Sequence, residues 1–445
     1  MRSTRLRAAA ALLCLATVVP ATACGAGGGG GAVTLGYWLW DDKQLPAYQE
    51  CADAFQQANP GVSVKITQTA WGQYWQNLTT QLAAGQAPDV WTNQNSYYPQ
   101  FATRNQLLDL EPLVKRDNLD LTAYRPGLAD VWVKDGKRYG LPKDWDTMAL
   151  VYNSAMLAER GVGPAELAGL TWNPADGGTL ERVIAKATVD EQGRDGLDPA
   201  FDKNRVRVHG FLPEWADGAQ GQNGWGILAA ANGFHYLDKN PWGTRYRYDD
   251  PKLAETIAWY QRLIDKGYAP RLDQQSTVAN SELLTAGKGA IMVAGSWTIL
   301  TFTAPELKQR FTFAPLPTGP AGRRGPVNGL ADAVWAGTEH PEQAWNWVKY
   351  LASADCQDRV ARHAVVFPAR TGSSRQAVAA HQAQGRDVHV FTDVAEQETF
   401  LLPVTDHATE IGPLVQDAIQ SAVLGRQSPQ AALAEANEKV NALFR

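Results

Sequence analysis

The sequence predicts an α/β protein built as two domains or as one large two-lobed unit. Short apolar strands alternate with amphipathic helices from residue 33 onward, a rhythm typical of parallel sheets covered by helices. The chain has 445 residues, whereas single hydrophobic cores stop growing at about 250–300 residues. Hydrophobic residues make up 44% of the chain and charged residues 20%, which excludes wholesale disorder.

The first third of the chain predicts three strand–helix steps. The expected elements are strands at 33–38, 62–66 and 89–91 and helices at 46–58 and 74–84. The first helix is predicted by Tyr48, Cys51 and Phe55, which recur at helical spacing, and Pro60 and Gly61 follow its end.

The same alternation continues to the end of the chain. Strands are expected at 138–142, 149–152 and 290–293, and helices at 251–266, from 341 onward, at 411–424 and at 429–444. Asn153 and Ser428 are expected to cap the helices that follow them. Residues 172–225 are rich in Gly, Asp and Pro, so they are expected to be the least regular part.

Residues 1–24 have the features of a signal peptide. Three arginines precede an apolar run at 8–19 that is too short to span a bilayer. We expect Cys24 to become the acylated first residue of a lipoprotein, because the glycine-rich tether at 25–31 suits an anchored, mobile domain. Ala21 stands where lipoprotein signals usually have leucine, so a simple cleavage site is the alternative.

The charge of the chain bears on its partners. Loss of residues 1–23 removes three arginines and changes the formal net charge from −5 to −8. An acidic chain without a basic stripe argues against nucleic acid as a partner. No later segment is long and apolar enough to span a bilayer, so the lipid anchor is the one expected membrane attachment.

Two cysteines remain in the folded part, Cys51 and Cys356. Export permits a disulfide between them. The alternative is two small buried residues, because each cysteine lies in a helical pattern.

Motifs of several enzyme classes are missing. The sequence has no Gly-rich phosphate loop, no Gly-x-Ser-x-Gly elbow and no Cys or His cluster with metal-ligand spacing. We therefore expect neither a metal nor a cofactor.

Aromatic and polar residues gather instead where the predicted strands end. These clusters are Trp38, Trp40, Asp41 and Asp42; Trp71, Tyr74 and Trp75; Asn93 to Tyr98; Asp144 to Thr147; and Ser296 with Trp297. Ligands of open α/β sheets bind beyond the carboxyl ends of the strands, so the clusters predict one binding region. For any single tryptophan, a core position remains the alternative.

The residue types of these clusters suit a carbohydrate. Aromatic rings can cover the apolar C–H faces of a pyranose, while Asp and Asn match its hydroxyls. A buried polar group left unmatched costs about 1–3 kcal/mol, which gives such a site its selectivity.

At this point the chain resembles the extracellular sugar-binding proteins of ABC importers, the family that includes maltose-binding protein (family 1). The resemblance extends over the mature chain and rests on the order and spacing of several short runs. They are Ala54 to Val62, Pro88-Asp89-Val90, Tyr139 to Pro142, Ala149 to Asn153, Gly289 to Met292, Gly295-Ser296-Trp297 and Phe367 to Arg370.

The resemblance implies a two-lobed periplasmic-binding-protein fold with three hinge crossings and a ligand cleft between the lobes. Lobe 1 would comprise 32–143 and 327–371, and lobe 2 would comprise 144–326 and 372–445. Both cysteines would then fall in lobe 1, which favours the disulfide. The lobes would close on the sugar and present it to the permease subunits of the importer. The protein would act as a monomer, lipid-anchored on the extracellular face of the cell membrane.

The resemblance also implies ligand contacts at positions matching the family's motifs. These are Trp40, Asp41, Asn93, Ser96, Trp145, Asp146, Trp297 and Asn328, with Trp71 and Trp225 as additions. Pro403 to His407 replaces an aromatic that maltose binders usually carry, which argues against maltose itself.

Two other functions remain open on the sequence. A secreted carbohydrate-active hydrolase needs two carboxyl groups about 5–10 Å apart, and Asp41, Asp42, Asp144 and Asp146 could supply them. A non-sugar solute such as a peptide or polyamine is the other alternative. The tether and the two-lobe pattern favour a binding protein that is not an enzyme.

Overall fold

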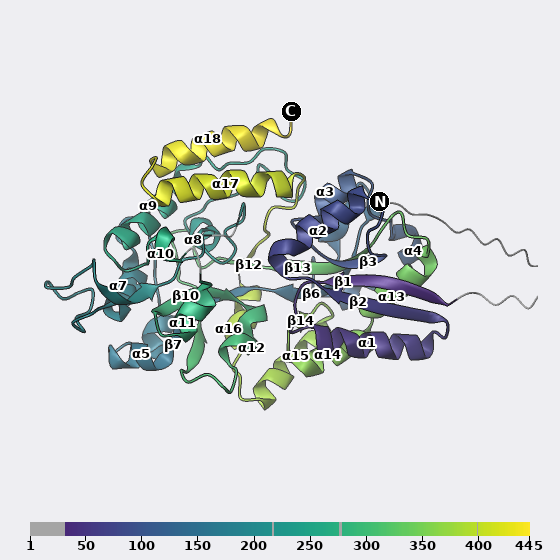
Figure 1. Cartoon of the computed structure of the whole chain (residues 1–445), viewed down its shortest axis with the longest axis horizontal. Coiled ribbons are helices and arrows are strands. Elements are labelled where there is room, and N and C mark those ends of the chain that lie inside the picture. Colours follow the sequence, from purple (N-terminus) through teal and green to yellow (C-terminus); the bar gives the residue numbers. More distant parts are fainter. Residues whose placement is uncertain (1–31, 216–217, 276–277, 398) are drawn as a thin grey trace, which may run out of the picture.

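The computed structural model describes residues 32–215, 218–275, 278–397 and 399–445. The predicted signal peptide, the glycine-rich tether and the acylation site Cys24 lie outside the described residues. The described chain is α/β, as predicted, and its strands form two main sheets. Figure 1 shows these sheets side by side, each with its own helices, and β6 and β13 lie near the centre of the view.

The first sheet has six strands in the order β14-β6-β13-β3-β1-β2. The strands are β1 (Val33–Leu39), β2 (Val62–Gln68), β3 (Val90–Gln94), β6 (Leu141–Asp146), β13 (Asn328–Val334) and β14 (Phe367–Pro368). β1 pairs in parallel with β2 and β3, whereas β13 runs antiparallel between β3 and β6.

The second sheet has five strands in the order β11-β7-β10-β9-β8. The strands are β7 (Met148–Asn153), β8 (Val189–Asp190), β9 (Val206–Phe211), β10 (Gly289–Gly295) and β11 (Phe311–Ala314). Only β9 and β10 run parallel, because β7 enters directly from β6 and pairs antiparallel with both β10 and β11. Short strands β4 (Val133–Lys134), β5 (Lys137–Arg138), β12 (Gly325–Pro326) and β15 (Thr399–Phe400) form two small ribbons.

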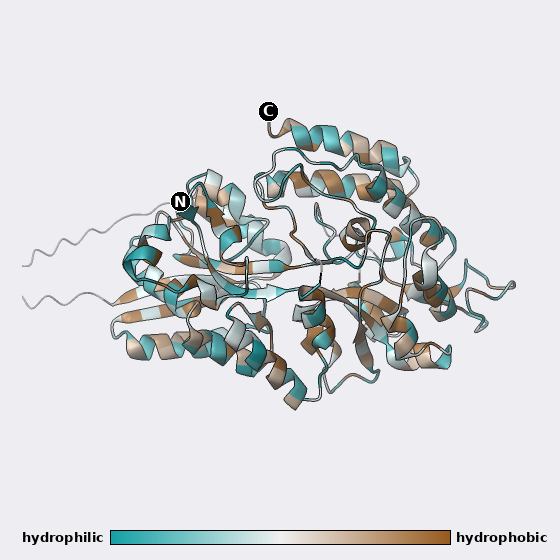
Figure 2. Ribbon diagram, turned by 180° about the vertical axis from the view of Figure 1, so that it is seen from behind, coloured by the Kyte–Doolittle hydropathy of each residue, from teal (hydrophilic) through white to brown (hydrophobic). Residues whose placement is uncertain are grey.

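Helices cover both sheets. Those packed around the first sheet are α1 (Leu45–Ala58), α2 (Trp71–Ala83), α3 (Tyr98–Thr103), α4 (Glu111–Arg116), α13 (Pro341–Leu351), α14 (Ala354–His363) and α15 (Thr371–Ala383). Helix α16 (His389–Ala395) contacts both cores and packs on β7. Those around the second are α5 (Ser154–Glu159), α6 (Pro164–Ala168), α7 (Gly178–Ala187), α8 (Trp225–Ala231), α9 (Pro251–Asp265), α10 (Leu272–Gln275), α11 (Asn280–Thr285), α12 (Ile299–Phe302), α17 (Ala408–Val423) and α18 (Pro429–Ala442). Figure 2 shows apolar strands in the interior and polar stretches on the outer helices.

Helix starts follow the capping chemistry predicted from the sequence. The side chain of Asn153 accepts a hydrogen bond from the backbone N–H of Met156 and caps α5. Ser428 does the same for Ala431 at the start of α18, where Pro429 occupies the first position.

Two regions differ from the sequence-based expectation. Residues 172–225, expected to be irregular, contain α7 and the strands β8 and β9, since α7 buries Leu180, Val183 and Ile184 at helical spacing. Residues 144–146, which fall between the strands predicted at 138–142 and 149–152, belong to β6, because β13 on one side and β14 on the other pair with them.

The two sheets have separate cores. Around the first sheet, Trp345 and Trp347 of α13 are fully buried, and a disulfide joins Cys51 of α1 to Cys356 of α14. Around the second sheet, Trp259 and Tyr260 of α9 pack with the apolar face of α17. No helix within the described ranges is long and apolar enough to cross a membrane.

The helices after residue 371 divide between these cores. Ala377 of α15 belongs to the buried cluster that surrounds the first sheet. Phe391 of α16 belongs to that cluster too, and its ring also meets Phe313 of β11 in the second sheet, with centroids 5.0 Å apart. Ile411 of α17 and Leu433 of α18 belong to the cluster of the second sheet. The chain therefore passes from the first core to the second after α15, and α16 packs against both.

Candidate ligand cleft between the two sheets

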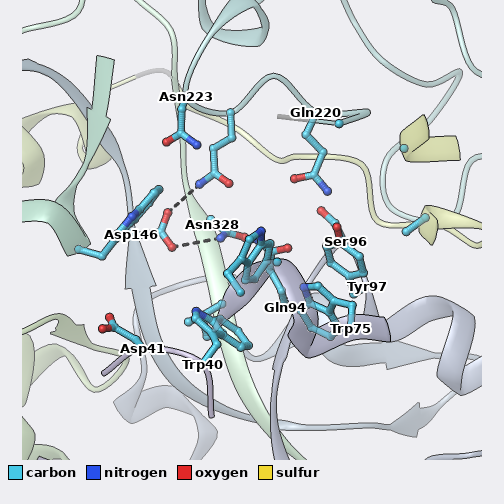
Figure 3. A pocket seen from close by; sticks show the side chains of 18 of the residues that line it. Trp40, Asp41, Trp75, Gln94, Ser96, Tyr97, Asp146, Gln220, Asn223 and Asn328 are labelled. Atoms are coloured by element: carbon cyan, nitrogen blue, oxygen red, sulfur yellow. Dashed lines mark hydrogen bonds between the residues drawn. The ribbon is translucent and has the colours of Figure 1, made fainter. Parts of the chain in front are cut away.

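A cleft of about 1470 Å³ lies between the two halves of the molecule. Its lining comes from the ends of the first-sheet strands, from α2, from the loop 218–223 and from α17. Figure 3 shows Trp40, Trp75 and Tyr97 on one side of Asn328, with Gln220 and Asn223 on the opposite side. Segments that are far apart in the sequence thus face one another across the cleft.

The aromatic wall of the cleft consists of Trp40, Trp71, Trp75 and Tyr97. Trp40 follows β1 and Trp71 begins α2 after β2, so parallel strands bring both to one edge of the sheet. The ring centroids of Trp75 and Tyr97 lie 4.1 Å apart at 3°, a stacked pair, and those of Trp40 and Trp71 lie 5.1 Å apart. Trp71 is 43% exposed despite its size, which leaves an aromatic face available to a ligand.

The floor of the cleft follows from strand register. Asp146 of β6 lies opposite Asn328 of β13, and two residues earlier Asp144 lies opposite Leu330, which in turn lies opposite Gln94 of β3. Directly opposed residues share a face, as do residues two apart on one strand. All five of these residues accordingly line the cleft.

Asp146 is the centre of a buried hydrogen-bond group. Its Oδ1 accepts from Nε2 of Gln222 at 3.0 Å, and its Oδ2 accepts from Nδ2 of Asn328 at 3.1 Å. Gln222 precedes α8 in the second half of the molecule, so this group links the central strands to that half.

The two floor carboxyl groups are hard to ionise. Burial raises the pKa of Asp144 to about 8, although the neighbouring Lys143 lowers it. Burial also raises the pKa of Asp146 to about 7, against the two amide hydrogen bonds that lower it. Lys143 is also buried, and its Nζ donates to Tyr37 and Thr92 at 3.1 and 2.7 Å.

Carboxylates also stand at the rim. Asp41 accepts from the backbone N–H of Lys43 and from Nε2 of Gln44, both at 2.9 Å, which fixes the turn after β1. Asp42 lies next to it, and Asp417 of α17 is exposed on the other side of the cleft.

The structure brings most of the sequence-predicted contact residues to this cleft. Those that line it are Trp40, Asp41, Trp71, Ser96, Trp145, Asp146, Trp297 and Asn328. Trp297 lies in the short helix after β10 and reaches the cleft from the second sheet. Trp145 borders the cleft, but its side chain is 3% exposed and its ring stacks on Phe367 at 5.0 Å.

Asn93 and Trp225 are not among the lining residues. Asn93 is fully buried and alternates with Gln94 along β3, so its side chain lies on the other face of the sheet. Trp225 is 2% exposed and packs on Phe234 and Tyr236 at the start of α8. A tryptophan in a Gly-rich loop gave no sequence signal to separate core from cleft.

Several lining residues were not among the predicted contacts. Trp75, Gln94, Tyr97, Asp42 and Asp144 lie within the aromatic and polar clusters at strand ends, which was the available signal. Gln220, Gln222 and Asn223, and Thr409, Gln416 and Asp417 of α17, have no such signal, because only tertiary packing brings them to the cleft. No group of three or more His, Cys, Asp or Glu in the described ranges could hold a metal ion.

Known proteins share this sequence pattern and fold. The profile of a family described as "Bacterial extracellular solute-binding protein" matches residues 50–387. The diacetylchitobiose binding protein DasA of Streptomyces coelicolor is 25% identical over 343 residues, which cover 75% of this chain and 73% of the relative.

Solved structures extend the comparison to nearly the whole chain. UspC of M. tuberculosis is 25% identical with a TM-score of 0.72 and covers 92% of this chain and 100% of its own. The ABC substrate-binding protein Lmo0181 from Listeria monocytogenes, solved with cycloalternan, is 18% identical with a TM-score of 0.79 and covers 93% of this chain and 99% of its own.

Proposed function

We propose, since the chain belongs to the bacterial extracellular solute-binding proteins, that it captures a carbohydrate outside the cell and delivers it to an ABC-type permease. The observation that carries the proposal is the pairing of an aromatic wall with a polar floor in one cleft. Trp40, Trp71 and Trp75 offer ring faces to sugar C–H groups, while Asp146 and Asn328 offer polar atoms to hydroxyls.

The size of the cleft favours an oligosaccharide over a single sugar. Its volume of about 1470 Å³ exceeds the roughly 300–1,000 Å³ of ordinary small-molecule pockets. The relative DasA is a diacetylchitobiose binding protein and MdxE of Bacillus subtilis is a maltodextrin-binding protein, so ligands of several sugar units occur among the relatives.

The two halves of the molecule act as lobes that close on the ligand. We keep lobe 1 as 32–143 and 327–371 and lobe 2 as 144–326 and 372–445, with one refinement. Because α15 packs on the first core, we propose that residues 372–383 move with lobe 1. Closure would shield the sugar from water and complete the surface offered to the permease.

The ten contact residues predicted from the sequence remain proposals, and the cleft supports them unequally. Trp40, Asp41, Trp71, Ser96, Asp146, Trp297 and Asn328 are supported by their place in the lining. Trp145 is proposed to position the floor rather than to touch the ligand, since its ring is buried. Asn93 and Trp225 lie outside the lining, and we assign them no contact.

The export features fit this role. We propose that Cys24 is acylated and that the mature protein acts as a monomer on the extracellular face of the membrane. Palmitate labelling of the wild-type chain in a bacterial host, compared with Cys24→Ser, tests the anchor. Equal labelling of the two chains would contradict it.

We propose no catalysis, although carboxyl groups line the cleft. Both carboxyl oxygens of Asp146 accept from amide groups, an arrangement that holds a side chain still. Incubation with oligosaccharides followed by chromatography separates the two functions, because a hydrolase would release shorter products at catalytic turnover.

A thermal-shift panel of mono- and oligosaccharides, peptides and polyamines tests the proposed function. A ligand that binds only the folded state increases the free energy of unfolding by mass action, by about 2.7 kcal/mol at a hundred times its Kd. The melting temperature rises as a result. We expect the largest shift from an oligosaccharide, followed by calorimetric titration of that sugar. A shift from peptides or polyamines alone would overturn the carbohydrate proposal.

A further inference from the structure

The cleft has a one-sided charge. Among the described residues that line it, five are aspartates, namely Asp41, Asp42, Asp144, Asp146 and Asp417, and one is a lysine, Lys43. Lys43 is already paired with Asp42 at 3.5 Å. Lys143, next to Asp144 in the sequence, is buried, donates to Tyr37 and Thr92, and does not line the cleft.

The floor of the cleft presents mainly hydrogen-bond acceptors to a ligand. Asn328 donates its Nδ2 to Asp146, so its amide orientation is set and its remaining polar atom is the acceptor Oδ1. Gln222 likewise donates a hydrogen bond from its Nε2 to Asp146. Asp146 therefore accepts hydrogen bonds from both side-chain amides, and the carbonyl oxygens of these amides remain available to other partners.

Three buried acceptor atoms of the floor lack a partner. They are Oδ2 of Asp144, Oδ1 of Asn328 and one end of the Gln94 amide, which rotates to present its oxygen, and these three residues are 1%, 2% and 4% exposed. Buried polar atoms in folded proteins are nearly always hydrogen-bonded, so unpaired acceptors in a cleft indicate where a ligand supplies donors. On this floor, across three neighbouring strands, the missing group is a donor.

We propose that the ligand carries a cationic amine, as in an oligosaccharide that contains an unacetylated amino sugar, and that this amine sits on the floor formed by Asp144, Asp146, Asn328 and Gln94. The inference rests on the proposed function, since it specifies the class of carbohydrate. An ammonium group brings three donors and no acceptor, whereas a hydroxyl also brings lone pairs against the acceptors already there.

The ionisation of the floor agrees with this assignment. Burial raises the pKa of Asp144 and of Asp146 toward neutrality, although the nearby Lys143 lowers that of Asp144. A bound ammonium would favour the ionised carboxylates and so strengthen its own hold. The aromatic wall beside the floor adds ring faces that attract cations.

Matched trisaccharides test the proposal. Glucosamine trimer, cellotriose and N-acetylglucosamine trimer differ at carbon 2, which carries an ammonium, a hydroxyl or an acetamide. Calorimetric titration at pH 6.5 should give at least tenfold tighter binding of the aminated trimer than of the other two, and the difference should shrink as salt increases. Equal or tighter binding of cellotriose or the acetylated trimer would overturn the amine assignment and leave the carbohydrate function standing. Failure of all three to bind, together with no sugar in the thermal panel, would overturn the carbohydrate function itself.

Charge-neutral variants locate the amine. Asp144→Asn keeps the shape of the floor and should reduce the preference for the aminated trimer at least fivefold, with a smaller effect on cellotriose. Asp417→Asn, on the exposed rim, should reduce the preference for the aminated trimer less. It is the variant to use if Asp144→Asn does not fold. Asp53→Asn on the outer surface of α1 is the matched control and should leave the preference unchanged. An undiminished preference in both cleft variants would overturn the assignment to this floor.

Discussion

At the scale of single residues, the cleft depends on which side of a strand a side chain lies. Asp144 and Asp146 line the cleft, whereas Lys143 donates to Tyr37 and Thr92 and the buried ring of Trp145 stacks on Phe367. The sequence located this segment as a contact site, but it did not assign sides, because residues 141–146 are buried throughout and carry no polar–apolar alternation.

Truncating a cleft tryptophan on either lobe should weaken binding without unfolding the chain. Trp71→Ala and Trp297→Ala each remove a ring that lines the cleft, and Trp71 is 43% exposed, so its loss creates no core cavity. We expect the Kd for the best sugar of the panel to rise more than tenfold, about 1.4 kcal/mol, by calorimetry. Leu197→Ala, also on an exposed side chain but outside the cleft, should bind like wild type. Near-native affinity would remove the substituted tryptophan from the site.

The buried carboxyls should make the empty protein less stable as the pH rises above neutrality. Their folded pKa values, about 8 for Asp144 and about 7 for Asp146, exceed the unfolded value near 3.8. The folded state therefore holds protons that the unfolded state has released, and it must give them up between pH 6.5 and 8.5. Integrating over that window gives a loss of roughly 2 kcal/mol from Asp144 and roughly 1 kcal/mol from Asp146.

Denaturant melts at pH 6.5 and 8.5 measure this loss. The window lies above the titration of the half-buried His209 and the buried His381, whose pKa values desolvation lowers to about 4. Asp144→Asn should remove most of the pH dependence, whereas Asp53→Asn should keep it. A wild-type stability that is flat or rising across the window would contradict the raised pKa values.

At the scale of elements, hydrophobic periodicity predicted the amphipathic helices, whereas fully buried strands carry no periodic pattern and were harder to predict. The amphipathic helices α1, α9 and α13 begin at or within one residue of their predicted starts, because Pro46, Pro251 and Pro341 mark their first turns. Strand β13, which supplies Asn328 to the floor, was not predicted as a strand, since its run from Asn328 to Val334 has no alternating pattern. The loop 218–223 also escaped prediction, because its place depends on contacts made by Tyr236 and Tyr248.

The disulfide should stabilise lobe 1 by joining two of its helices. Cys51 and Cys356 join α1 to α14 across 305 residues of sequence, and closing long loops in the unfolded chain gives the largest entropic stabilisation. Cys51→Ser with Cys356→Ser should lower the free energy of unfolding by about 2–5 kcal/mol. Reductant should lower the melting temperature of wild type and not that of the double variant. Equal melting of the two proteins without reductant would contradict this role.

At the scale of the whole molecule, contacts distant from the sugar should set how tightly the lobes stay together. Trp242, between α8 and α9 of the second half, reaches the first half: its Nε1 donates to the carbonyl of Val133 at 3.2 Å and its ring meets that of Tyr98 edge-on. Lys134 Nζ lies 4.6 Å from the same ring. This side chain does not line the cleft, so its effect on binding would run through lobe closure.

Trp242→Ala should therefore weaken sugar binding without removing a sugar contact. When only a fraction of molecules adopts the closed form, the apparent Kd rises by the inverse of that fraction. We expect the apparent Kd to rise about tenfold. The rise should appear mainly as faster dissociation in surface-plasmon measurements, because the closed form that holds the sugar opens more readily. Small-angle X-ray scattering of the free variant should show a larger radius of gyration than wild type, and saturating sugar should abolish the difference. Trp335→Ala, which removes a similar ring within lobe 1 alone, should lower stability and leave the dissociation rate unchanged. If Trp242→Ala released the sugar at the wild-type rate, the link between this contact and closure would fail.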